Sequence, residues 1–90
     1  MKTRILLADD HMVMRAGLRM VLNTAPDIRI LAEGASGMEA LRLVKSYAPN
    51  VLVLDVNMPD LTGLEVTQRL RTQGEQIPIL ILTVHADGET

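Results

Sequence analysis

Three short apolar runs constrain the fold of this chain more than any other feature. They are residues 5–8, 51–54 and 79–82, and none of them alternates apolar with polar side chains. Uninterrupted runs of this length are typical of strands that are covered on both faces, as in a parallel sheet between helices. A fourth run, residues 28–33, includes charged side chains and is typical of an edge strand. The sequence therefore predicts a four-stranded, largely buried parallel sheet.

Helical patterns fill the three intervals between these runs. The first helix, residues 12–23, has an apolar stripe at helical spacing that consists of Met14, Gly17, Leu18 and Val21. The second begins at a capping box in residues 36–39 and ends before Pro49, because the residue before a proline disfavours helical geometry. The third begins at a capping box in residues 62–65, with Gly74 just beyond its end. The element order is therefore βαβαβαβ, which predicts an α/β fold.

The handedness of the connections determines the order of the strands. If residues 28–33 form an edge strand, the chain runs outward from the first strand and returns past it to the third. Right-handed crossovers then place the first helix on one face of the sheet and the other two on the opposite face. We expect a doubly wound parallel sheet with strand order 2-1-3-4. Ligands in such sheets bind at the switch point, which here lies between the first and third strands.

Composition narrows the class of protein. Ninety residues form one domain at most, spanning 1–90, and a hydrophobic content of 48% is too high for a disordered segment. The chain has no cysteine, a net charge of −2 and no basic run. These features argue against thiolate metal sites and against direct nucleic-acid contact by this segment. No run has transmembrane length, and two aspartates follow residues 5–8 at once, which a signal peptide would not tolerate. We expect a cytoplasmic protein.

Three carboxylates should meet at the switch point. Asp9 and Asp10 follow the first strand, and Asp55 ends the third. Neighbouring strands lie about 5 Å apart, so these groups should crowd into one pocket and raise one another's pKa. A hard divalent cation removes that repulsion, and carboxylate oxygens suit Mg²⁺. The alternative is that Asp9 and Asp10 are solvated or cap the following helix, as aspartates often do.

The same residues belong to a set of motifs that resembles the receiver domain of bacterial two-component response regulators. The chain is similar to CheY-like receivers, which have a flavodoxin-type sheet, and more narrowly to those of the NarL/FixJ, or LuxR-type, regulators. The resemblance covers essentially all ninety residues in the same order. The matching segments are LLADDH (6–11), RAGL (15–18), GMEAL (37–41), LDVNMPD (54–60), GLE (63–65) and PILILT (78–83).

The resemblance implies a role for each of five residues. Asp55 would accept a phosphoryl group from a histidine kinase. Asp10 would bind Mg²⁺ directly, Asp9 would act through water, and the main-chain carbonyl of Asn57 would be a further ligand. The hydroxyl of Thr83 would bond a phosphoryl oxygen and move inward on phosphorylation. Such a domain assists its own phosphoryl transfer and dephosphorylation, is not an enzyme for other substrates, and controls a DNA-binding output domain.

The chain departs from the family at its C-terminal side. Family receivers continue into a fourth helix, a fifth strand with a lysine and an aromatic switch residue, a fifth helix and then a helix–turn–helix module, whereas this sequence ends at Thr90. We therefore expect a truncated receiver. The fourth strand would have an unpaired edge, and apolar surface would be uncovered, so we expect a dimer or larger assembly in which this strand pairs with a partner or a segment is exchanged.

Other functions and roles stay open from the sequence alone. The chain could be a self-association module that works without phosphorylation. A phosphatase of the haloacid dehalogenase type would need an acidic residue two places after its nucleophile, where this sequence has Asn57. Thr83 could be a β-branched residue chosen for strand packing. His11 could be a metal ligand or phosphodonor, or could only begin the first helix.

Overall fold

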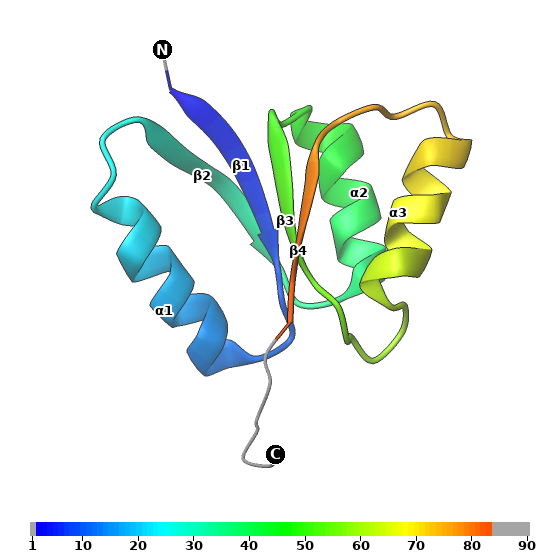
Figure 1. The fold of residues 1–90 in the computed structure, drawn as a ribbon, viewed down its shortest axis with the longest axis horizontal. Helices are drawn as coiled ribbons and strands as arrows, with labels where there is room; N and C mark the ends of the chain where they lie inside the picture. The colour runs from blue at the N-terminus through cyan, green and yellow to red at the C-terminus, as the bar shows by residue number, and fades with distance from the viewer. Residues whose placement is uncertain (1, 84–90) are drawn as a thin grey trace.

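Four strands and three helices alternate along the chain, as the apolar runs predict (Figure 1). The computed structural model describes residues 2–83. The elements are β1 (Thr3–Ala8), α1 (Met12–Asn23), β2 (Ile28–Gly34), α2 (Gly37–Tyr47), β3 (Val51–Asp55), α3 (Gly63–Thr72) and β4 (Ile79–Leu82). In this part of the chain, no helix has the length and apolar character needed to cross a membrane.

The strands form one parallel sheet in the predicted order, β2-β1-β3-β4. Figure 1 shows α1 on one face of this sheet and both α2 and α3 on the other, as right-handed connections require. β2 is an edge strand, in agreement with its charged residues. Its pairing with β1 shifts by one residue between Ile5 and Leu6, where β2 carries an additional residue. The predicted doubly wound α/β fold is confirmed.

Alternate residues of the central strands contribute to two cores of unequal size. Leu6, Leu52 and Leu54 face α2 and α3 and belong to a cluster of eleven buried residues. Their neighbours Ile5 and Leu7 belong, with one β3 residue, to a cluster of only three buried residues on the side of α1. The fold therefore depends mainly on the α2 and α3 side, and α1 covers its face less completely.

The helix α1 packs with only part of the predicted stripe: Met14 and Leu18 are half-buried, whereas Gly17 and Val21 are exposed. Leu18 and Leu22 contact the smaller cluster, and no residue of α1 is fully buried. Val21, which we expected in the buried stripe, has 66% of its surface exposed. Val13 and Met20, two further apolar residues of α1, are exposed as well. The prediction was wrong at Val21 because helical periodicity defines several adjacent apolar stripes without indicating which of them meets the sheet.

The predicted caps of α3 are present, whereas that of α2 differs in one contact. The Thr62 hydroxyl accepts a hydrogen bond from the main-chain N–H of Glu65. The Glu65 carboxylate accepts one from the main-chain N–H of Thr62, and the two bonds together complete the capping box. Gly74 has the positive φ of 89° expected beyond the helix end. At α2, Ser36 caps the main-chain N–H of Glu39, but the carboxylate of Glu39 accepts from Ala35 instead of Ser36. The capping box predicted there is therefore incomplete.

The loop between β3 and α3 is held to the start of α2 by one aspartate. The carboxylate of Asp60 accepts from the main-chain N–H groups of Gly37 and Met38 at 2.8 and 2.9 Å. It also accepts from Leu61 in its own loop at 2.8 Å. These N–H groups lower the pKa of Asp60, with Met38 and Gly37 contributing most. A side chain 23 positions away thus supplies a second cap for α2.

The start of α3 lies so close to β3 that only glycine fits there. A Cβ at Gly63 would lie 2.9 Å from the main-chain oxygen of Asp55. By contrast, a Cβ at Gly17, within α1, would have no atom within 4 Å. We expect Gly63→Ala to destabilise the fold by about 1–3 kcal/mol, because the main chain at Asp55 or at the start of α3 must move to make room for the methyl group. Gly17→Ala, the matched control, should stabilise it by about 0.5–1 kcal/mol. Urea unfolding would measure both, and equal effects would contradict this account.

The lowered pKa of Asp60 makes part of the stability depend on pH. The folded state favours the ionised form of this carboxylate, which therefore adds to the free energy of unfolding. This contribution is fully present above the ordinary aspartate pKa of about 4 and is lost as the pH falls through the lower pKa of the folded state. We expect Asp60→Asn to lower the unfolding free energy at pH 7, and the difference from wild type to shrink below about pH 4. Asp27→Asn, at an exposed aspartate outside this contact, is the control. A difference that does not shrink as the pH falls below about 4 would refute the prediction.

Candidate functional site

The pairing of β1 with β3 brings Asp9 and Asp55 to the same level at the carboxyl end of the sheet. Ala8 pairs with Leu54, so the residue that follows each lies at the adjacent position. Both carboxylates are buried, with 4% and 6% of their side-chain surface exposed. Asp10 lies at the rim, with 31% exposed. The structure thus gathers the three carboxylates that the sequence placed at the switch point.

His11 joins this cluster from the start of α1. Its Nδ1 lies 3.0 Å from Oδ1 of Asp9, 3.2 Å from Oδ1 of Asp10 and 3.4 Å from Oδ2 of Asp55. One ligand atom from each of the four residues lies within 4.8 Å of every other. Asp9 also accepts from the main-chain N–H of His11 at 2.8 Å, and this contact fixes the turn between β1 and α1.

The pocket opposes the ionisation of its central carboxylate. Burial raises the pKa of Asp55, the nearby charge of Asp9 adds to this effect, and the main-chain N–H of Asn57 opposes it. Oδ2 of Asp55 is buried without a hydrogen-bond partner among the described residues. The hydrogen bond to Asp9 raises the pKa of His11, followed in size by the charge of Asp10. The cluster therefore has more negative charge than its own hydrogen bonds satisfy.

This donor set fits a divalent cation. Three carboxylates supply the hard oxygen ligands that Mg²⁺ prefers. The buried, unpartnered Oδ2 of Asp55 is a polar atom that such a ligand would satisfy, because an uncompensated buried carboxylate oxygen is costly. The partly exposed side chain of Asp10 leaves the pocket open for a ligand that keeps bound water.

The two remaining predicted residues lie beside the pocket. Asn57 is exposed, two residues after β3, and its main-chain N–H acts on the Asp55 carboxylate. Thr83 directly follows Leu82, which pairs with Asp55. The side chain of Thr83 is exposed. Both are therefore placed next to the carboxylates, and their roles as metal ligand and switch hydroxyl stay predictions.

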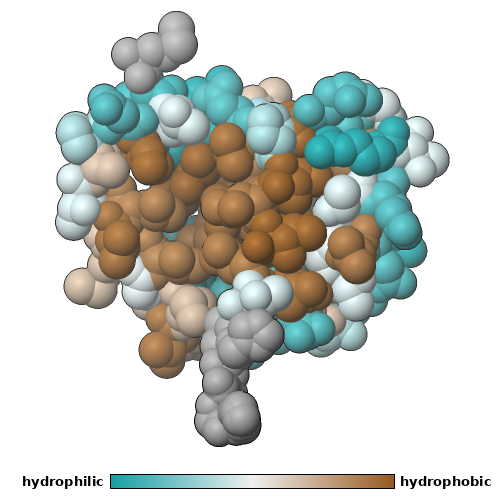
Figure 2. Space-filling model, in the orientation of Figure 1, coloured by the Kyte–Doolittle hydropathy of each residue, from teal (hydrophilic) through white to brown (hydrophobic). Residues whose placement is uncertain are grey.

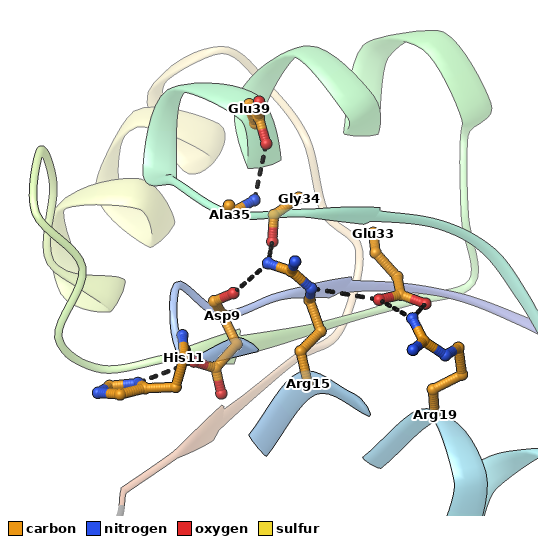
Figure 3. Close-up of polar contacts among 8 residues, drawn as sticks. All are labelled: Asp9, His11, Arg15, Arg19, Glu33, Gly34, Ala35 and Glu39. Carbon is orange, nitrogen blue, oxygen red and sulfur yellow. Dashed lines mark hydrogen bonds and ion pairs between the residues drawn. The ribbon is translucent and has the colours of Figure 1, made fainter. Parts of the chain in front are cut away.

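A network of arginines, which the sequence reading did not identify, supports the pocket from α1. Arg15 donates from its guanidinium to the main-chain oxygen of Asp9 at 2.8 Å and forms an ion pair with Glu33 at 3.3 Å (Figure 3). Arg19 donates to both carboxylate oxygens of Glu33 at 2.9 Å. The end of β1 is thereby tied to α1 and to β2. The spacing of Arg15 and Arg19 at i, i+4 was the only local signal of this network.

Comparison with known proteins identifies the family. The sequence pattern of the response regulator receiver domain matches residues 5–90. The oxygen regulatory protein NreC of Staphylococcus aureus is 40% identical over 87 residues, which cover 96% of this chain and 40% of NreC. The transcriptional regulatory protein DegU of Brevibacillus brevis is 35% identical over 86 residues, covering 96% of this chain and 36% of DegU. The chain thus spans well under half the length of these relatives.

Solved structures have the same fold. A two-component response regulator of the LuxR family from Aurantimonas superposes with a TM-score of 0.88 at 35% identity, covering 94% of this chain and 61% of that one. The signal receiver domain of the response regulator NarL from Mycobacterium tuberculosis gives a TM-score of 0.89 at 29% identity, covering 96% and 69%. These matches exclude the haloacid dehalogenase alternative. The chain belongs to the response regulator receiver domain family and is related to regulators of the LuxR type.

Proposed function

We propose that the chain receives a phosphoryl group on Asp55 from a histidine kinase, with Mg²⁺ held by the surrounding carboxylates. The observation that carries this proposal is the buried, unpartnered Oδ2 of Asp55 within a cluster of carboxylates at the switch point of the sheet. An acceptor carboxylate must be free of competing hydrogen bonds to attack phosphorus, and Oδ2 of Asp55 has none among the described residues.

The proposed step is a displacement at phosphorus. An oxygen of the Asp55 carboxylate forms a bond to the phosphorus of a phosphohistidine, the phosphorus–nitrogen bond breaks, and the electron pair stays on the departing imidazole. The product is an acyl phosphate on Asp55. A bound Mg²⁺ supplies neutralising charge for the phosphoryl oxygens. Asp10 would hold the cation directly and Asp9 through water, and Arg15 fixes the main chain of Asp9.

Further roles follow from the family and belong to the same proposal. The main-chain carbonyl of Asn57 would complete the cation's protein ligands, and the Thr83 hydroxyl would bond a phosphoryl oxygen at the end of β4. Relatives such as DegU are transcriptional regulators, and this chain covers 36% of that protein. We propose that the phosphorylated domain controls a DNA-binding output domain and itself makes no contact with DNA. The cytoplasmic location stays a prediction.

Labelling with acetyl phosphate tests the acceptor. We expect one phosphate on the chain in the presence of Mg²⁺, located at Asp55 by mass spectrometry. Asp55→Asn should abolish the label, and Asp10→Ala should reduce it at least about tenfold because the cation binds less tightly. Asp27→Asn, at an exposed aspartate away from the pocket, is the control and should take up the label as the wild type does. A phosphate on another residue, or uptake unchanged in Asp55→Asn, would contradict the assignment.

A second candidate function, self-association of this chain, is favoured by its surface. The strand β4 pairs with β3 alone in the described part of the sheet, so its other edge has free main-chain groups there. Leu80 on this strand has 54% of its surface exposed. Figure 2 shows apolar residues spread over the face on which β4 lies in Figure 1. We propose that a second copy of the chain covers this edge and face.

Sedimentation equilibrium of the ninety-residue chain tests self-association. At micromolar concentration we expect a dimer or larger assembly, because an exposed apolar face beside a free strand edge favours association. Leu80→Lys should shift the equilibrium toward monomer by placing a charge beside the β4 edge. Leu64→Lys, at an exposed leucine of α3 on the other side of the sheet, is the matched control. A well-folded wild-type monomer would refute this proposal and leave the acceptor role unaffected.

A further inference from the structure

We propose that His11 is a metal ligand that makes this pocket favour cations with an affinity for imidazole, such as Co²⁺ and Zn²⁺, over Mg²⁺. The inference rests on the proposed function to the extent that both use the carboxylates of Asp9, Asp10 and Asp55. It adds a nitrogen donor to their oxygens and so concerns which cation the pocket selects.

The distances around His11 suit shared coordination of one ion. Its Nδ1 lies 3.0, 3.2 and 3.4 Å from oxygens of Asp9, Asp10 and Asp55. Nitrogen and oxygen ligands bound at about 2.0–2.2 Å to one ion lie about 2.9–3.5 Å apart in octahedral or tetrahedral geometry. All three separations fall in this interval. Nδ1 is nearest to Asp9, with which it forms a hydrogen bond at 3.0 Å, and oxygens of Asp10 and Asp55 lie only slightly farther away at 3.2 and 3.4 Å.

A separate observation points to a ligand at the same place. Oδ2 of Asp55 is buried and has no hydrogen-bond partner among the described residues. This oxygen is the one that lies 3.4 Å from Nδ1 of His11. Buried carboxylate oxygens are normally satisfied, because an unpaired one loses its hydration without compensation. A cation between Asp55 and His11 would satisfy it.

The position of His11 at the helix start leaves its ring available. His11 is the N-cap of α1, yet its side chain makes no capping hydrogen bond to the helix. Serine, threonine, asparagine and aspartate are the residues that favour this position, so histidine contributes little to the helix end. The main-chain N–H of His11 donates to Asp9, and the ring Nδ1 lies within 3.4 Å of three carboxylate oxygens. The side chain is therefore directed to the pocket and has no capping role.

The chemistry of the donor set determines the selectivity. Mg²⁺ binds oxygen ligands and retains several waters, so an imidazole adds little to its affinity. Co²⁺ and Zn²⁺ accept imidazole readily and bind nitrogen–oxygen sites more tightly than the lighter divalent ions. A pocket of three carboxylates and one imidazole therefore has a larger affinity ratio of Co²⁺ or Zn²⁺ to Mg²⁺ than a pocket of carboxylates alone.

Calorimetric titration with MgCl₂ and CoCl₂ at one pH tests this inference. His11→Asn is the informative variant because asparagine is a favoured N-cap, so the helix start is preserved while the imidazole is removed. We expect the affinity for Co²⁺ to fall at least about tenfold, the loss typical for removing a group that supports a metal site. The affinity for Mg²⁺ should change by less than about twofold, because its oxygen ligands remain. Circular dichroism would verify that the variant is folded.

Two further measurements distinguish a failure of the His11 inference from a failure of the proposed function. In ¹⁵N-edited NMR of the wild-type chain, Zn²⁺ should shift the Nδ1 resonance of His11 as direct coordination requires. An unshifted resonance, or the same Co²⁺ to Mg²⁺ affinity ratio in wild type and His11→Asn, would overturn the inference. Asp55→Asn should weaken binding of both cations. If it bound both as the wild type does, the pocket would not be the metal site, and the proposed function would fail with it.

Discussion

The parallel pairing of β1 with β3 is the constraint on which the rest of this structure depends. It sets Ala8 opposite Leu54, so the carboxyl ends of the two strands lie side by side at the same edge of the sheet. Because side chains alternate between faces, a shift of one residue would exchange the two core faces as well as separate Asp9 from Asp55. The packing of the larger core and the geometry of the acidic pocket are therefore determined by the same hydrogen bonds.

Concentrating carboxylates at this point works against folding, and neighbouring groups compensate for part of the effect. Burial, together with the charges of Asp9 and Asp10, raises the pKa of Asp55, which means that the folded protein disfavours its charged form. His11 places a ring nitrogen among the carboxylates, and Arg15 places its charge on the main-chain oxygen of Asp9. Glu33 in turn fixes Arg15 through an ion pair. The pocket is thus held by residues that do not themselves belong to the predicted phosphate-accepting set.

The sequence predicted what short-range patterns determine and missed what depends on distant contacts. Apolar runs and capping residues located every strand and helix, and connection handedness then gave the sheet order. The burial of Val21 was predicted wrongly, since only the docked position of α1 decides which stripe faces the sheet. The cap that Asp60 provides for α2 was missed, because its partner amides lie 22 and 23 residues away. The ring orientation of His11 likewise follows from the turn geometry and has no signal in the motif.

The place of β4 connects the pocket to the exposed apolar surface. Leu82 pairs with Asp55, and Thr83 follows it directly, so the end of this strand adjoins the proposed acceptor. In the described sheet β4 is paired on one side only, and Leu80 has 54% of its surface exposed. A strand held on one side can shift at lower free-energy cost than one held on both, because fewer hydrogen bonds and contacts must change. A charge added to Asp55 would therefore act first on the strand whose free edge and apolar face are available to a partner.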